Sequence, residues 1–123
     1  MTYLHEGRLD KAQAAAEGLT RRTPKNPAAY NVLGAVRIHA RDSAGARVAS
    51  EKAQQLDPSF LPAVGNLARL DLAQGRPDQA KARFQSLLAK DPKNTGASLG
   101  LVRLLVQIQA KPEEIRKVLE TAI

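Results

Sequence analysis

The sequence predicts an all-α fold in which similar helical hairpins stack into a solenoid. Ala and Leu are abundant, whereas the 123 residues contain only two Phe, two Tyr and no Trp, and this balance favours closely packed helices over a β-sheet. The sequence also repeats with a period of 34 residues, which separates Ala12 from Ala46 and Ala46 from Ala80. Within each period, apolar residues recur at spacings of three and four, as on the buried stripe of an amphipathic helix.

The first predicted helix covers residues 9-22. Gly7, which precedes it, matches Gly75 two periods later, and residues 3-7 are interpreted as the end of an earlier helix that pairs with it. We therefore expect the chain to open inside a repeat, with a partial repeat over residues 1-26.

Prolines mark the boundaries of the later helices. Asp57-Pro58 and Asp91-Pro92 end helices, because the residue before a proline is pushed out of the α region. Pro77 and Pro112 instead stand at helix starts, where the carboxylates that follow them suit the free N–H groups of a first turn. The remaining helices are expected over residues 27-40, 44-56, 61-74, 77-90, 95-109 and 112-122.

These helices combine into full repeats over residues 27-60 and 61-94 and a hairpin over residues 95-123. In the last hairpin one residue is inserted, so that Pro112 aligns with Pro77 only at an offset of 35. No terminal helix with a polar outer face follows, although solenoids normally need such a cap. The single array over residues 1-123 is therefore expected to be an excised piece of a longer one.

The repeats share a pattern of a Leu followed by Gly or Ala, then further small residues and a closing proline, and this pattern resembles the tetratricopeptide repeat family. The resemblance covers nearly the whole chain. The matching residues are Tyr30, Leu33, Gly34, Ala46, Ala53 and Pro58 in the first full repeat, and Leu67, Ala68, Gly75, Ala80, Phe84 and Pro92 in the second.

The small residues of this pattern are expected to let paired helices approach closely, as with Gly34 on one helix and Ala46 on its partner. Four departures are expected to weaken individual repeats. They are Arg41 at the usual turn Gly, Ser50 at a usual aromatic, and Arg37 and Asp71 at the usual Tyr. The resemblance implies a right-handed α-solenoid of about three and a half hairpins, acting as a protein-interaction scaffold.

In the tetratricopeptide fold the first helix of each hairpin lines a concave surface, which implies where a protein or peptide partner would bind. Arg69 and Arg103 lie one period apart on this surface and are expected to pair with carboxylates of the partner. The alternative is that both arginines contact only water or the neighbouring Asp71. The residues implied to face inward are Asn31, Ala35, Ile38, His39, Gly65, Arg69, Leu72, Ala73, Leu99, Arg103, Val106 and Gln107.

The sequence offers no pattern that would carry catalysis, a cofactor or a metal. It has no Cys, no His-Glu-x-x-His motif and no Gly-rich phosphate loop. His5 and His39 lie one period apart but bring no nucleophile or carboxylate with them at a repeated spacing. Apolar runs such as residues 104-106 are far too short to insert this segment into a membrane.

The net charge of +7 suggests nucleic acid as an alternative partner, but the basic residues are interleaved with acidic ones along the second helix of each hairpin. A solvated outer face explains this pattern, and nucleic-acid binding is not expected. A helical-repeat RNA binder and a purely structural spacer remain the alternatives to the interaction scaffold.

A narrower resemblance concerns residues 56-63, 66-78 and 88-94, which are similar to repeats of large bacterial lipoproteins found with exosortase (PEP-CTERM) and exopolysaccharide systems. This implies a periplasmic or cell-envelope protein with a role in protein sorting or exopolysaccharide export; without it, a cytoplasmic location is expected. Apolar residues at the two ends are further expected to be exposed and to support self-association. They are Leu9, Leu19, Ile115, Leu119 and Ile123.

Overall fold

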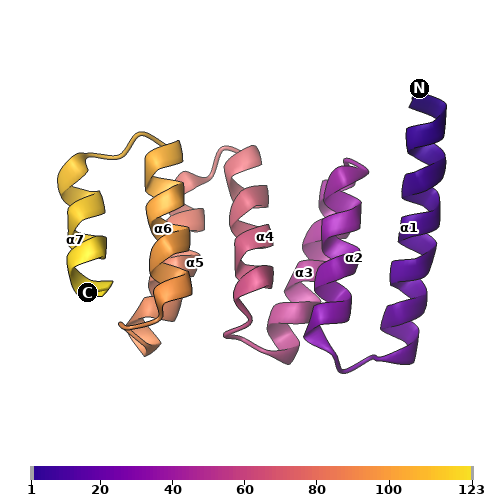
Figure 1. The fold of residues 1–123 in the computed structure, drawn as a ribbon, viewed down its shortest axis with the longest axis horizontal. Helices are drawn as coiled ribbons and strands as arrows, with labels where there is room; N and C mark the ends of the chain where they lie inside the picture. The colour runs from indigo at the N-terminus through magenta and orange to yellow at the C-terminus, as the bar shows by residue number, and fades with distance from the viewer. Residues whose placement is uncertain (1, 123) are drawn as a thin grey trace. The chain divides into compact units, whose positions relative to one another are not determined.

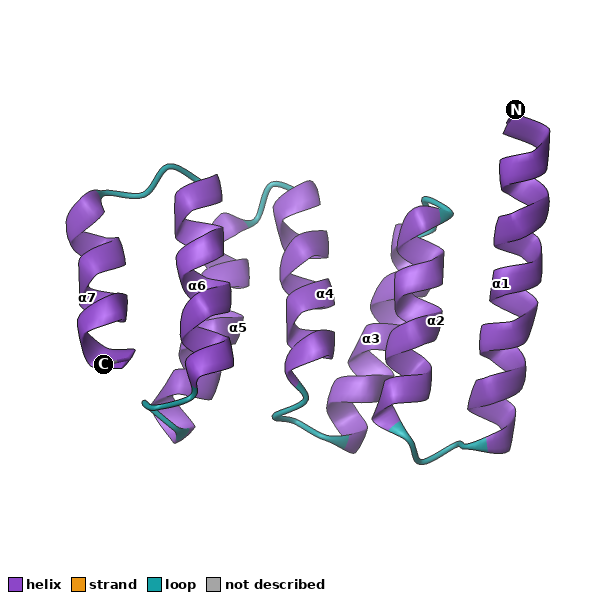
Figure 2. Cartoon of the chain, viewed as in Figure 1, coloured by secondary structure: helices purple, strands orange, loops and turns teal. Residues whose placement is uncertain are grey.

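The computed structural model describes the backbone of residues 2–122 and the side chains of residues 7–121. This part of the chain is all-α, as predicted, and contains no strand (Figures 1 and 2). The chain divides into two compact units, Met1–Leu67 and Ala68–Ile123, and each is considered by itself below. The helices are α1 (Thr2–Arg22), α2 (Pro27–His39), α3 (Ser43–Leu56), α4 (Leu61–Ala73), α5 (Pro77–Lys90), α6 (Thr95–Gln107) and α7 (Pro112–Ala122).

Helix α1 corrects one prediction, because it runs without a break from Thr2 to Arg22. The helix end expected at Gly7 is therefore wrong. Gly7-Arg8-Leu9-Asp10 resembles Gly75-Arg76-Pro77-Asp78, where a turn does form, but Leu stands in place of the proline. A single Gly costs a helix only about 1 kcal/mol, and without Pro nothing forces the chain out of the α conformation.

The turns inside the three hairpins share one backbone geometry. Arg41, Gly75 and Gln109, each 34 residues apart, have φ values of 63°, 74° and 58°. In each turn the N–H of the next residue reaches back to a carbonyl five residues earlier, as from Arg76 to Asp71 at 2.8 Å. This is the Schellman ending of a helix, and it closes α2, α4 and α6 one or two residues earlier than predicted. The residue inserted in the last hairpin lies after Gln109. The 34-residue alignment of the repeats therefore holds through this turn and shifts by one residue only after it.

Local hydrogen bonds define the helix starts. The side chains of Asn26, Asp42 and Asn94 accept hydrogen bonds from backbone N–H groups in the first turns of α2, α3 and α6. Asp57 and Asp91, the residues before the prolines, adopt extended conformations and end α3 and α5, as predicted.

The core of the first unit is built from small residues. Ala16 of α1, Leu33 of α2 and Ala49 of α3 form a buried cluster with Val36 against it. A Cβ at Gly34 would lie 2.6 Å from the Ser50 hydroxyl and 3.4 Å from the Ala46 carbonyl oxygen. The predicted close approach of α2 and α3 is therefore confirmed, and a side chain at residue 34 would require the Ser50 hydroxyl to move.

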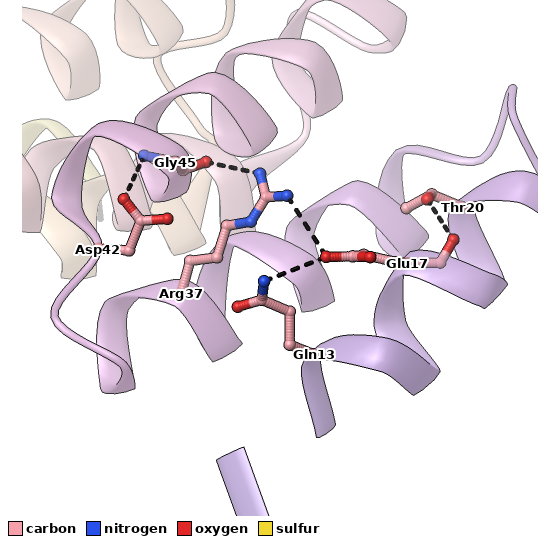
Figure 3. A network of polar contacts seen from close by, with 6 residues as sticks. All are labelled: Gln13, Glu17, Thr20, Arg37, Asp42 and Gly45. Carbon is pink, nitrogen blue, oxygen red and sulfur yellow. Dashed lines mark hydrogen bonds and ion pairs between the residues drawn. The ribbon is translucent and has the colours of Figure 1, made fainter. Parts of the chain in front are cut away.

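Arg37 ties three helices of this unit together (Figure 3). Its guanidinium donates a hydrogen bond to the Gly45 carbonyl at 3.1 Å and lies 3.9 Å from the Glu17 carboxylate on α1. Gln13 also donates to Glu17, at 3.1 Å. Arginine at a position where the family usually has Tyr thus links the helices on either side of α2.

The second unit is held by both apolar and ionic contacts. The buried ring of Phe84 on α5 lies directly against Gly100 of α6, so a Cβ there would be 2.5 Å from the ring. Asp71 of α4 is fully buried and accepts hydrogen bonds from the Arg83 guanidinium of α5. Lys81 of α5 donates to Glu114 of α7 at 2.8 Å, and this hydrogen bond raises the pKa of Lys81 above its ordinary value.

Candidate partner-binding surface

In the first unit, the predicted binding residues of α2 differ in exposure. Asn31, Ala35 and Ile38 are half-buried, and only His39 is exposed. The side-chain oxygen Oδ1 of Asn31 accepts a hydrogen bond of 2.8 Å from the side-chain amide of Asn66, which is itself buried. Asn31 is therefore engaged in holding α2 to α4 within this unit.

In the second unit, α6 presents the most accessible of the predicted residues. Leu99 and Val106 are 48% and 60% exposed, and Arg103 and Gln107 beside them are exposed as well. Residues 99, 103 and 106 are spaced by four and three, so they share one side of the helix. Together they form an apolar stripe on α6 with the Arg103 guanidinium at its centre.

Four of the predicted binding residues lie on α4. Arg69 and Ala73 are exposed, and Gly65 and Leu72 are half-buried. The alternative partner considered for the arginines, Asp71, is fully buried and hydrogen-bonded to Arg83. Among the side chains of residues 7–121, neither Arg69 nor Arg103 takes part in an ion pair.

The charge on these helices is one-sided. Asp71 is the only acidic residue in α2, α4 and α6, and it is inaccessible. The exposed faces of the first helices therefore carry guanidinium groups and apolar side chains but no carboxylate. Such a surface is electrostatically complementary to an acidic partner.

The described residues show no arrangement suited to metal chemistry. Among them, no three His, Cys, Asp or Glu side chains gather as a metal site would require. His39 is exposed, and the side chain of His5 lies outside the described part. No helix within residues 2–122 is both long and apolar enough to cross a membrane.

A pocket that sequence reasoning did not anticipate lies between α5, α6 and α7. Its volume is about 260 Å³, and it is lined by Gln85, Leu88, Ser98, Leu101, Lys117, Val118 and Thr121. The sequence contained one indication of this pocket. Ser98 is smaller than the residues at the equivalent repeat positions, which are Val64, 34 residues earlier, and Tyr30, 68 residues earlier.

The fold of this chain is similar to those of several solved structures. The first tetratricopeptide repeat domain of Spaghetti (RPAP3), bound to the HSP90 peptide SRMEEVD, is 19% identical over 89% of this chain and 86% of that chain, with a TM-score of 0.66. MamA is 18% identical over 98% of this chain and 72% of that chain, with a TM-score of 0.70. MamA MSR-1 C2 is 20% identical over 98% and 68% of the two chains, with a TM-score of 0.62.

The sequence comparisons agree with the fold. No curated protein sequence matches the chain significantly. One tetratricopeptide repeat model matches residues 37–89 and 71–122, and a second matches residues 1–59. The α-solenoid predicted from the period of 34 is thereby confirmed, and the chain belongs to the tetratricopeptide repeat family.

Proposed function

We propose that this chain is a protein-interaction scaffold that binds an acidic polypeptide segment on the exposed faces of its first helices. Tetratricopeptide repeats are typically non-enzymatic interaction modules, and one structural neighbour holds a peptide that contains carboxylates. The observation that carries the proposal is the stripe of Leu99, Arg103 and Val106 on α6, together with the unpaired Arg69 on α4.

In this proposal the partner's carboxylates pair with the two guanidinium groups, and its apolar side chains cover the exposed Leu and Val. Charge-assisted pairs supply orientation, because neither arginine has a competing carboxylate on its own helix that is accessible. The apolar residues supply most of the burial, since each fully covered side chain contributes about 1.5–3 kcal/mol.

Selection from a displayed peptide library, followed by fluorescence anisotropy on the selected peptides, tests the proposal. We expect acidic sequences with interspersed apolar residues to be enriched. The Arg69→Glu, Arg103→Glu double variant should weaken their binding at least tenfold, whereas Lys90→Glu, Arg116→Glu, which changes net charge equally at exposed sites of α5 and α7, should change it little. Equal loss in both double variants would show only a general charge effect and would contradict the assigned surface.

We further propose that the chain self-associates through α7. Leu119 is 42% exposed, and Ile115 one turn earlier is half-buried. Leu119 is equivalent to Phe84, whose ring is covered by α6, so the same position on α7 is an apolar surface without a described cover. Leu9 and Leu19 of α1 are half-buried, and Ile123 lies outside the described residues.

We propose a bacterial cell-envelope location for this scaffold, with a role in protein sorting or exopolysaccharide export. Its support is the resemblance of residues 56-63, 66-78 and 88-94 to lipoprotein repeats of exosortase systems. A lipoprotein signal upstream of the segment, beside exosortase or polysaccharide genes, would agree with this location, and a cytoplasmic fraction in cell fractionation would contradict it.

A further inference from the structure

The pocket between α5, α6 and α7 has the Ser98 hydroxyl in its wall. Ser98 is only 3% exposed, and among the described residues nothing forms a hydrogen bond with its hydroxyl. Because the pocket is open, the Ser98 hydroxyl oxygen remains accessible to solvent, and a ligand there can replace water as its hydrogen-bond partner. The remaining walls are largely apolar, with Leu88, Leu101 and Val118.

The first hairpin shows what fills the same place elsewhere in the chain. The position of Ser98 is occupied there by Tyr30, and the position of Thr121 by Lys52, once the inserted residue is allowed for. The Lys52 ammonium lies 6.0 Å from the centre of the Tyr30 ring. In the second unit a serine replaces the tyrosine, and the pocket of about 260 Å³ lies at that position.

The size and charge of the pocket restrict which ligands it can bind. A cavity of about 150 Å³ holds benzene, so about 260 Å³ accommodates about ten non-hydrogen atoms, which is a ring with a short polar group. Lys117 is the only charged residue in the lining, and it forms no ion pair with a side chain of residues 7–121. A second ammonium, that of Lys93, lies alongside, donating to the Thr121 carbonyl at 3.3 Å. The polar group is therefore an anion.

We propose that this pocket anchors the C-terminal aromatic residue of a partner polypeptide. The ring occupies the space that Tyr30 fills in the first hairpin, the Ser98 hydroxyl forms a hydrogen bond with the ligand, and Lys117 pairs with the terminal carboxylate. A C-terminal residue carries its carboxylate close to its ring, as the small volume requires. Ser98 and Leu101 lie on a different side of α6 from Leu99, Arg103 and Val106, so this site is independent of the peptide surface proposed above.

Backbone amide shifts of the ¹⁵N-labelled chain, titrated with N-acetyltyrosine, test the assignment. We expect millimolar binding with shifts around residues 85–88, 98–101 and 117–121, and none with N-acetylalanine. N-acetyltyrosinamide, which lacks the carboxylate, should bind several-fold more weakly. Equal binding of acid and amide, or no binding by the acid up to tens of millimolar, would overturn the proposal.

Two variants separate this site from a nonspecific effect. Ser98→Tyr should fill the pocket with the chain's own ring, abolish binding and raise Tm by a few degrees; unchanged binding would overturn the site. Lys117→Gln should weaken the acid several-fold without affecting the amide, whereas Arg116→Gln on the exposed side of α7 should change neither. A loss of acid binding that is as large in Arg116→Gln as in Lys117→Gln would contradict the pairing.

A further titration distinguishes a polypeptide C-terminus from a free aromatic acid as the natural ligand. If 4-hydroxyphenylacetate binds tenfold more tightly than N-acetyltyrosine, the pocket is a site for a free aromatic acid and the polypeptide assignment is overturned. Similar or weaker binding of 4-hydroxyphenylacetate supports a polypeptide terminus. The Arg69→Glu, Arg103→Glu variant should bind N-acetyltyrosine normally, so the failure of one proposal is distinguishable from the failure of the other.

Discussion

At the scale of single residues, Arg41 is held in a backbone conformation that disfavours any residue with a Cβ. Its φ of 63° falls in the left-handed region, which costs a non-glycine residue about 1–2 kcal/mol. Gly75 occupies the same position one repeat later at 74° without this cost. The departure from the family pattern at residue 41 therefore leaves the turn geometry intact and lowers only its stability.

We predict that Arg41→Gly stabilises the chain by about 0.5–1 kcal/mol, the relief of backbone strain being partly offset by the greater freedom of glycine in the unfolded chain. The reciprocal change, Gly75→Ala, should destabilise it by about 1 kcal/mol. Urea denaturation followed by circular dichroism measures both. A destabilising Arg41→Gly would mean that the exposed arginine side chain makes a contact worth more than the strain.

The family pattern does not predict the contacts that Arg37 and Asp71 make. Both stand where the family usually has Tyr, and both were expected to weaken their repeats. The structure instead gives each a partner, Gly45 and Glu17 for Arg37 and Arg83 for Asp71. The partners lie on other helices, so no local pattern could reveal them.

At the scale of helices, glycine has opposite roles on α4 and α6. Gly100 lies against the buried ring of Phe84, whereas nothing lies within 4 Å of a Cβ placed at Gly65. Both glycines are in helix interiors, where the intrinsic preference favours alanine by about 1 kcal/mol. Only packing distinguishes them.

We predict that Gly65→Ala stabilises the chain by about 0.5–1 kcal/mol and that Gly100→Ala destabilises it by about 1 kcal/mol, because overpacking outweighs the gain in helix preference. Thermal unfolding of the two variants provides a matched comparison. In the Phe84→Leu background the cost of Gly100→Ala should shrink, and an unchanged cost there would show that the ring is not its cause.

At the scale of the whole molecule, the net charge of +7 arises from both units, but its accessible part is unevenly distributed. The first helices have no exposed carboxylate, whereas α3, α5 and α7 each carry both acidic and basic residues. This distribution fits an acidic polypeptide on one set of helices better than a continuous track for nucleic acid, which needs phosphate contacts repeated in each unit.

Self-association also belongs to this scale. We predict that the molar mass measured by light scattering rises with concentration, because the exposed Leu119 is buried between copies. Leu119→Lys should suppress the rise, whereas Val48→Lys, at a still more exposed apolar position on α3, should leave it unchanged. A constant monomer mass at millimolar concentration would contradict self-association.

The sequence by itself determined the helices, their boundaries to within a few residues after α1, the hairpin turns and the family, because period, proline placement and amphipathic spacing are local properties of the chain. The resemblance to the tetratricopeptide family, rather than a local pattern, implied that Arg69 and Arg103 face a partner, and both residues are exposed. The continuity of α1 also emerged only with the structure, although its cause, Leu9 in place of a proline, is local. Only the tertiary structure decided the pairing of Asp71 with Arg83 and the pocket at Ser98. Each of these depends on which side chains meet across helices, and in a close-packed interior the loss of one large side chain leaves a space that no single segment records.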